Sequence, residues 1–330
     1  MNAKLISGAL AALLLTGCGS STSNDILSQQ FIHKYGLDLS EQEWEQRSKE
    51  GQVVTLLKDG VRIIRAYEGG QLHGPTTYSF PHSSVVERLM MYDHGVLLKE
   101  VLHDARGVPN REEAYEFDNR TVITLWDEQG TPLSMEKYED DLLVEGTYYT
   151  PAHEVEGKVE GGNGERVRRD RTGQLLCRDT IQDGTLASRT SFHPNGQIHT
   201  VSHYRDFQLH DSQKKYTASG KPLMTIEWDR GVLNGPKVIY RNGVKISEIP
   251  YVNSQKHGTE KHFDDLGTLT AEIEWKNDKK HGPSRFHTDE TTITEWYFRG
   301  QPVEEEKYYT MEQHDTFIAE LDASLREEQP

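Results

Sequence analysis

The segment 224–251, MTIEWDRGVLNGPKVIYRNGVKISEIPY, alternates apolar and polar side chains over short runs. Met224, Ile226 and Trp228 fall on one face of an extended chain, and the polar residues between them fall on the other. The same alternation returns at 269–275, LTAEIEW. This period of two predicts half-buried β-strands rather than helices.

Turn signals divide the segment into strands. Asn234-Gly235 follows the first strand, and Asn242-Gly243 separates the second strand from a third that begins at Val244. Asn-Gly pairs favour the positive backbone dihedral angles that tight hairpin turns require. Each unit therefore reads as about two strands and two turns, and the sheet is predicted to be antiparallel.

An aromatic or apolar residue, called the anchor here, recurs along the chain at steps of 21 to 25 residues, on average 23. Such a period indicates a repeat array. The pattern is weakest around the anchors at 159 and 181. The anchors are Tyr67, Tyr92, Tyr115, Tyr138, Val159, Ile181, Tyr204, Trp228, Tyr251, Trp275 and Tyr297.

Six residues after five of these anchors lie His73, His210, Asn234, His257 and His281, and glycine follows all of them except His210. A catalytic histidine has no reason to recur with the period of the fold, whereas a residue entering a tight turn does. With two strands per unit, equivalent positions lie about 10 Å apart. Zinc ligands must each come within about 2.1 Å of the ion. We therefore expect turn residues and no metal site, although one strand per unit would reopen that question.

The repeat resembles the variant MORN repeat of bacterial antitoxin-like and surface proteins. Residues 192–198, FHPNGQI, are similar to the aromatic-x-P-N-G-x-aliphatic part of that repeat, and residues 228–235 are similar to its aromatic-x-x-G-x-x-x-G part. The resemblance covers about 67–300 and is clearest over 181–300. It implies an all-β, elongated array of antiparallel hairpins that binds other molecules and usually has no active site.

The repeat pattern is interrupted at 150–180. Gly161-Gly162-Asn163-Gly164 precedes a basic run from Arg166 to Arg171. The phase of the repeats, and whether the sheet continues through this stretch, are left open.

The amino terminus has the features of an export signal, with Lys4 before the apolar run 5–15. Eleven residues are too few to span a bilayer as a helix. Leu15-Thr16-Gly17-Cys18 resembles the lipobox of bacterial lipoproteins, which implies a signal peptide at 1–17 and acylation of Cys18. An ordinary signal peptide cut elsewhere is the alternative. Residues 18–24 then form the lipidated cysteine and a serine-rich flexible tether.

Atypical segments are expected at both ends of the array, because repeat arrays need covered ends. At 25–66, Ser40 and Glu43 predict a capped helix from 40 to 50 that stops at Gly51, followed by a leading hairpin. An earlier apolar set, Ile26, Leu27, Phe31 and Ile32, suggests a second helix there.

The repeat array itself is predicted at 67–309, and 310–330 is predicted as a capping helix. Thr310 and Gln313 have capping-box spacing, and the helix would carry an apolar stripe. A helix that binds a partner is the alternative reading of the stripe. Its members are Phe317, Ile318, Leu321 and Leu325.

Composition limits the classes of partner. The formal net charge of −16 and the pI near 5.4 argue against nucleic acid and anionic lipid surfaces, which require basic patches. The chain is 34% hydrophobic with a mean hydropathy of −0.75, which is lean for a thick core. If Cys18 is acylated, Cys177 is the remaining thiol and no internal disulfide forms.

The sequence contains none of the common catalytic or nucleotide-binding motifs that were sought: H-E-x-x-H, G-x-S-x-G, the Walker loop and the dinucleotide-binding fingerprint. No catalytic residue, metal ligand or cofactor is predicted. The candidate binding face is the aromatic row Trp228, Tyr251, Trp275 and Tyr297, which suits a peptide, a glycan or an acyl chain. Packing within a thin sheet is the plainer reading of the same row.

The sequence thus predicts a lipoprotein of the bacterial cell envelope, expected in the outer membrane because glycine follows Cys18. It would act as a non-enzymatic scaffold that binds an envelope protein, peptide or glycan. An immunity-like or antitoxin-like role is suggested by the resemblance alone. The alternative is an envelope hydrolase with a site of scattered His and Asp/Glu. Perturbed titratable groups converging in one deep pocket would favour the hydrolase.

Overall fold

A computed structural model describes residues 25–47 and 49–327. The chain divides into two compact units, Met1–Leu186 and Ala187–Pro330. The predicted signal peptide, Cys18 and the tether to residue 24 lie outside the described residues. Within the described residues, no helix is both long enough and apolar enough to cross a membrane.

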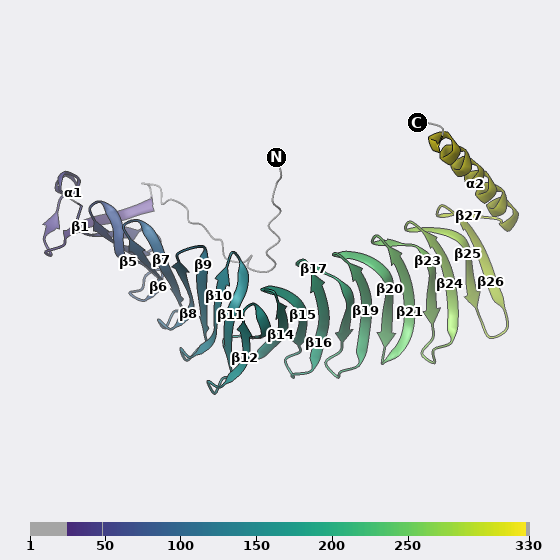
Figure 1. Cartoon of the computed structure of the whole chain (residues 1–330), viewed down its shortest axis with the longest axis horizontal. Coiled ribbons are helices and arrows are strands. Elements are labelled where there is room, and N and C mark those ends of the chain that lie inside the picture. The colour runs from purple at the N-terminus through teal and green to yellow at the C-terminus, as the bar shows by residue number, and fades with distance from the viewer. Residues whose placement is uncertain (1–24, 48, 328–330) are drawn as a thin grey trace. The chain divides into compact units, whose positions relative to one another are not determined.

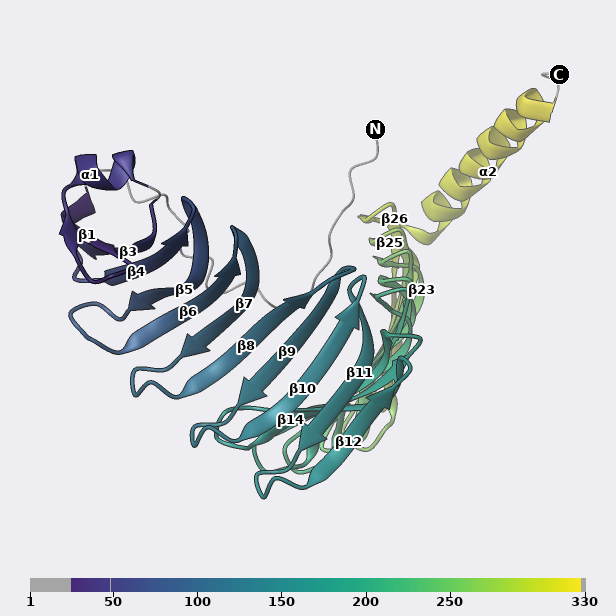
Figure 2. The ribbon, with the colours of Figure 1, turned by 60° about the vertical axis from the view of Figure 1, so that its left-hand side comes forward.

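The first unit is a run of antiparallel strands with one short helix near its start (Figures 1 and 2). Strand β15 continues past its boundary. Its elements are β1 (Ile26–His33), β2 (Asp38–Leu39), α1 (Glu41–Gln46), β3 (Gly51–Leu57), β4 (Arg62–Glu68), β5 (Gln71–Ser79), β6 (Val86–Asp93), β7 (Val96–His103), β8 (Pro109–Glu116), β9 (Arg120–Trp126), β10 (Pro132–Glu139), β11 (Leu142–Tyr149), β12 (Val155–Glu160), β13 (Asn163–Arg169), β14 (Leu175–Gln182) and β15 (Thr185–Phe192).

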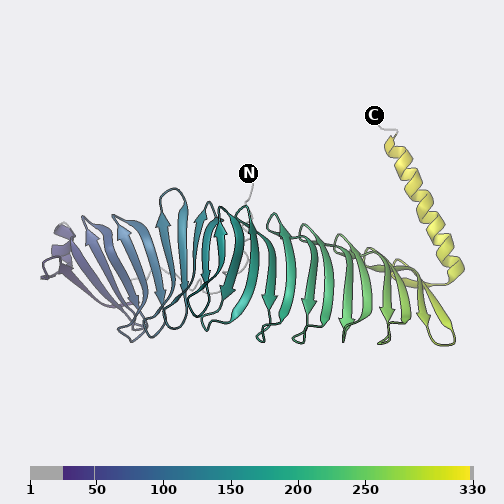
Figure 3. The same cartoon turned by 60° about the horizontal axis from the view of Figure 1, so that its bottom comes forward.

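The second unit repeats the hairpin pattern up to the long helix α2 (Figure 3). The prediction of an all-β antiparallel hairpin array with a helix at each end is confirmed. The remaining elements are β16 (Ile198–Arg205), β17 (Gln208–Leu209), β18 (Asp211–Tyr216), β19 (Pro222–Asp229), β20 (Val232–Arg241), β21 (Val244–Val252), β22 (Gln255–Lys256), β23 (Gly258–Phe263), β24 (Leu269–Lys276), β25 (Lys279–His287), β26 (Thr292–Phe298), β27 (Gln301–Val303) and α2 (Glu305–Glu327).

A two-residue turn begins two residues after every anchor except Tyr115, which is followed by the three-residue turn 117–119. Both residues of each two-residue turn, and the last two residues of the turn 117–119, have positive φ, as twisted hairpin turns of type I′ require. These pairs are Gly69-Gly70, His94-Gly95, Asp118-Asn119, Asp140-Asp141, Gly161-Gly162, Asp183-Gly184, Asp206-Phe207, Arg230-Gly231, Asn253-Ser254, Asn277-Asp278 and Arg299-Gly300.

The histidine-glycine stretches do not form these turns, so the predicted turn at Asn234-Gly235 and its equivalents is wrong. In the hairpin of β4 and β5, Arg65 pairs with Thr76 and Tyr67 pairs with Leu72, which leaves residues 73–75 as a bulge. The same bulge recurs at 234–236. Glycine is needed there because φ is positive, +84° at Gly74. The prediction identified the correct glycine but placed it in a turn instead of a bulge.

At the opposite ends of the hairpins most turns are longer, and in several of them an aspartate caps the loop. The Asp104 carboxylate accepts hydrogen bonds from the backbone N–H groups of Arg106 and Val108, and Asp264 does the same for Leu266 and Thr268. The predicted Phe192–Ile198 segment contains such a turn, closed by the Gly196 N–H on the His193 carbonyl at 2.8 Å. The Asn242-Gly243 turn also forms as predicted.

The amino-terminal end differs from the prediction in one element. Residues 26–33 form strand β1 rather than a helix, because they pair with β3 and complete the edge of the sheet. The capping box of Ser40 and Glu43 is present, but α1 ends at Gln46, and Gly51 begins β3. Trp44, 4% exposed, packs from α1 against Phe31 and Tyr67.

The carboxy-terminal helix begins at Glu305, five residues before the predicted cap. Thr310 lies inside it, and its hydroxyl donates to the Glu306 carbonyl instead of capping an end. The first half of α2 packs on the last strands through Tyr308 and Tyr309, whose rings lie 5.1 and 5.2 Å from that of Trp296.

The predicted stripe of α2 is exposed rather than packed on the sheet. Phe317 is 60%, Ile318 44% and Leu321 45% exposed. The side chain of Leu325 lies outside the described part of the helix. The stripe therefore does not supply the covering contact that the capping prediction assigned to it.

The first unit has a small apolar core at 143–186, where the repeat pattern is weakest. Tyr148 and Val159 are 1% exposed, and Ile181 is 3% exposed. The sheet continues through this stretch, but β12 and β13 share a short ladder, Val159 with Gly164 and Glu160 with Asn163. The weak anchors at 159 and 181 are thus aliphatic because they fill a core.

Candidate functional site

The four predicted binding residues share one face of the second unit. Cα partners across antiparallel strands lie on the same face, and the register links Trp228, Tyr251, Trp275 and Tyr297 through successive strands. They lie on β19, β21, β24 and β26, which are alternate strands of the order, so their spacing is about 10 Å. We call this side of the second unit the anchor face.

Each of three aromatic rings stands opposite a bulge glycine of the preceding hairpin. Tyr251 pairs with Gly235, and Trp275 pairs with Gly258. A glycine in a strand leaves the neighbouring side chain room to lie over the backbone. The anchor aromatics are half-buried, and the Lys256 ammonium lies 4.3 Å from the centre of the Trp275 ring. The row therefore combines packing with a partly accessible aromatic and cationic surface.

Polar groups without a hydrogen-bond partner also gather on the anchor face. The indole nitrogens of Trp228 and Trp275 and the hydroxyls of Ser247 and Ser284 are buried and unpaired in the described part of the chain. Buried polar groups are normally hydrogen-bonded, so such exceptions need an explanation. The other face carries the cross-strand pair of charged residues Glu272 and Arg285.

A buried ion cluster lies in the first unit and was not predicted. Arg166 donates two hydrogen bonds to the Glu136 carboxylate, at 2.6 and 2.9 Å. The hydroxyls of Tyr138 and Tyr148 donate to the same carboxylate at 2.7 and 3.0 Å. Glu136 is 5% exposed. All four groups are therefore satisfied by one another.

The cluster fixes the protonation states of its members. Burial alone would raise the pKa of Glu136, but the charge of Arg166 and the three hydrogen-bonding neighbours outweigh it and hold that pKa below its ordinary value. Burial, followed by the Glu136 charge, raises the pKa of Tyr138 and of Tyr148. A carboxylate held ionised by a buried guanidinium is typical of a structural pair.

The basic run that interrupts the repeat pattern forms internal ion pairs. Besides Arg166, Arg169 binds Glu156 at 2.6 Å, and Arg171 binds Asp104 at 3.1 Å. The backbone carbonyl of Arg171 also accepts the Glu128 N–H. Cys177, the buried thiol, lies on β14 in the same part of the unit. Three of the four arginines of the run therefore join segments that are distant in the sequence, whereas Arg168 is exposed.

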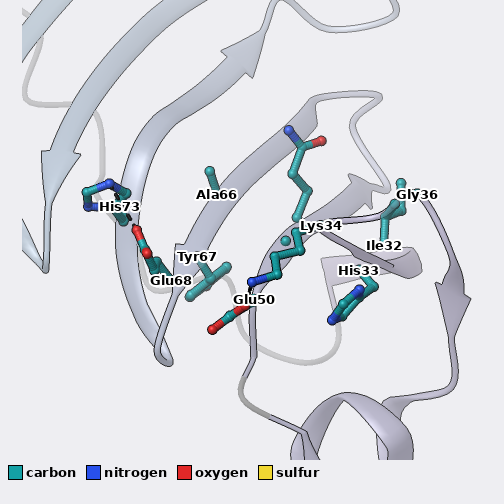
Figure 4. Close-up of a pocket in the computed structure, with 11 residues that line it drawn as sticks. Ile32, His33, Lys34, Gly36, Glu50, Ala66, Tyr67, Glu68 and His73 are labelled. Carbon is teal, nitrogen blue, oxygen red and sulfur yellow. Dashed lines mark ion pairs between the residues drawn. The ribbon is translucent and has the colours of Figure 1, made fainter.

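A cavity of about 530 Å³ lies near the amino-terminal end of the first unit (Figure 4). Ile32, Ala66 and Tyr67 give it apolar walls, and Lys34 and Glu50 form an ion pair beside it. Glu68 and His73 also line it. None of these residues was predicted as a site, because the cavity depends on β1 being a strand.

Comparison with known protein families finds the MORN repeat variant over residues 256–277, from β22 to the turn after β24. The predicted MORN type of the repeat is confirmed for this stretch, and with the all-β fold it suggests a repeat scaffold or binding protein. No curated protein matches the chain in sequence.

Two of the solved structures that match this chain illustrate how remote the similarity is. The first, the crystal structure of TcdB2-TccC3-TEV, is 10% identical over 84% of this chain with a TM-score of 0.20, and the match spans 20% of that longer chain. The second, a porin-like protein from Bacteroides uniformis, is 13% identical over 75% of this chain and 90% of its own, with a TM-score of 0.14. Both scores are too low to inform the fold.

Proposed function

We propose that the protein is a lipid-anchored, non-enzymatic scaffold of the bacterial envelope that binds a partner on the anchor face. The observation that carries the proposal is the regular aromatic row of Trp228, Tyr251, Trp275 and Tyr297 on one face of a MORN-type sheet. Aromatic side chains supply large rigid contact area and dominate many binding surfaces. The anchor would be Cys18, which the lipobox resemblance supports.

An extended peptide segment of an envelope protein suits the row best. The rings repeat about every 10 Å, which is close to three residues of an extended chain at about 3.3 Å each. Lys280 adds positive charge 4.6 Å from the Tyr297 ring, whereas Lys256 over Trp275 is paired with Glu260 at 2.7 Å. These features favour an acidic or neutral segment.

The hydrolase alternative requires perturbed titratable groups that converge on open space. The strongest cluster of such groups, around Glu136 and Arg166, is buried and internally paired. An immunity-like role, in which the protein neutralises its partner by binding, is a narrower form of the same proposal and rests on the family resemblance.

Mass spectrometry of the native protein purified with its partners tests the proposal. We expect an acylated peptide beginning at Cys18 and a reproducible partner.

Trp275→Ala should weaken partner binding by roughly 30-fold, because truncating a central aromatic contact typically costs about 2 kcal/mol.

Arg285→Ala is the matched control, since Arg285 lies on the opposite face, and it should leave binding unchanged. Melting temperatures of both variants show whether lost binding reflects unfolding. Free Cys18 within an intact amino terminus would refute the lipid anchor, and acylation without any partner would return the hydrolase to consideration.

A further inference from the structure

Three potential metal ligands converge at the turn edge of the first unit. Glu68 ends β4, His73 lies in the bulge of β5, and His94 begins the turn after β6. One ligand atom from each lies within 4.8 Å of the other two. His73 Nε2 is 3.2 Å from Glu68 Oε2, and the two imidazole rings are 4.6 Å apart. We propose that these three residues bind a divalent transition-metal ion of the zinc class.

The Asp93 carboxylate lies beside both imidazole rings and orients them for metal binding. Asp93 Oδ1 lies 3.3 Å from His73 Nδ1 and 2.6 Å from His94 Nδ1. A carboxylate that accepts the Nδ1–H of a histidine fixes the tautomer in which Nε2 is free to bind metal. Two imidazole nitrogens and one Glu68 oxygen suit Zn²⁺, with a water completing the tetrahedron. Metal binding would favour the Asp93 contact over the weaker one, in which His73 Nδ1 accepts the His94 N–H at 3.4 Å.

The histidine in the bulge has a structural role that repeats without the other ligands. His210 Nδ1 accepts the Arg230 N–H at 3.4 Å, and His281 Nδ1 accepts the Arg299 N–H at 3.2 Å. These contacts join one hairpin to the next in the second unit as His73 does in the first. The fold therefore explains His73 but requires neither Glu68 nor His94.

The positions equivalent to the two added ligands hold residues that do not suit zinc in the second unit. Where the first unit has Glu68, the units of His210, His257 and His281 have Arg205, Val252 and Lys276. Where it has His94, they have Arg230, Asn277 and Arg299. Among the described residues, the cluster of Glu68, His73 and His94 is the one group of three or more such side chains close enough to hold an ion.

The site also borders open space. Glu68 and His73 both line the amino-terminal cavity of about 530 Å³, and Figure 4 shows them together beside it. An ion held there would lie at the rim of the cavity, with its open coordination position accessible to water or to a ligand donor.

Calorimetric titration of the untagged full chain with Zn²⁺ alone tests the site. We expect one Zn²⁺ per chain, and His94→Arg should weaken its affinity at least tenfold. The variant should fold, because Arg230 and Arg299 occupy the equivalent turn position with φ of 48° and 49°, beside 44° for His94. Asp93→Asn should weaken affinity by roughly 10- to 100-fold, as loss of an orienting carboxylate does elsewhere.

His210→Gln is the matched control, since it removes the same structural contact where no ion is predicted. Its Zn²⁺ affinity should equal that of the unmodified protein. Unchanged affinity in His94→Arg would overturn the proposal, and so would an equal loss in His210→Gln, which would show scattered surface binding. Unchanged Zn²⁺ affinity in Glu68→Gln would also overturn the proposed three-ligand site.

Discussion

Replacing Glu136 with alanine is expected to lower the free energy of unfolding of the first unit by about 3–5 kcal/mol. The substitution leaves the Arg166 guanidinium buried without its counter-ion and removes the acceptor of two tyrosine hydroxyls. Breaking one side of a buried pair is costly because the remaining charge is neither solvated nor paired. Hydrogen exchange in β10 to β13 should accelerate by roughly a hundred- to several-thousand-fold.

Glu139→Ala is the matched control for this prediction. Glu139 lies on the same strand and binds Arg120 at 2.8 Å, but its side chain is 41% exposed. Exposed pairs contribute about 1 kcal/mol or less. If both variants changed exchange by the same small factor, the cluster would not stabilise the unit as the geometry implies.

Replacing Gly235 with asparagine should destabilise the second unit by about 2–3 kcal/mol. Its φ of +126° lies outside the left-handed region that asparagine tolerates, and an added Cβ would be 2.8 Å from the Glu227 Cβ. Relief requires the bulge to move, and Tyr251 pairs directly with this glycine. Hydrogen exchange in β19 to β21 should therefore accelerate by roughly 30- to 150-fold.

Gly243→Asn is the matched control for this prediction. Gly243 also has positive φ, +91°, but an added Cβ would meet no atom within 4 Å. Asparagine is accepted in such hairpin turns, so the cost should stay below about 1 kcal/mol. Equal effects at both positions would show that the bulge glycine has no special packing role.

The period and the alternation were sufficient to predict the strands and their antiparallel pairing. Trp228, Tyr251 and Trp275 could be placed on one face because they recur at the same position of consecutive units. The bulges preserve this shared orientation because each adds two residues to one strand. One residue between Ile226 and Trp228 lies opposite three residues between Leu233 and Lys237. The face prediction therefore survived an incorrect assignment of the turns.

The turns that follow the anchors could not be predicted because their residues share a conformation rather than a chemistry. Gly69-Gly70 and Arg230-Gly231 carry a usual signal, but Asp206-Phe207 and Asp140-Asp141 do not. The fold imposes positive φ on whatever residues follow the anchor. Asn234-Gly235 looks more like a turn than Arg230-Gly231 does, and local sequence preference chose the wrong pair.

Contacts between different hairpins also could not be predicted from the sequence. Glu136 and Arg166 are 30 residues apart, and nothing in either segment identifies the other. The predicted distance of about 10 Å applies only to histidines at the same position of adjacent units. His73 and His94 occupy different positions of consecutive units, and the bulge brings their rings to 4.6 Å.

Photo-crosslinking in cells tests most directly whether the partner lies on the anchor face. The photoreactive residue is placed at neighbouring positions of opposite orientation. His262 and Lys237 lie on the anchor face, and Lys261 and Val238 lie on the other. We predict crosslinks to one partner from His262 and Lys237 and none from Lys261 and Val238. Crosslinks confined to Lys261 and Val238 would show that the partner binds the opposite face.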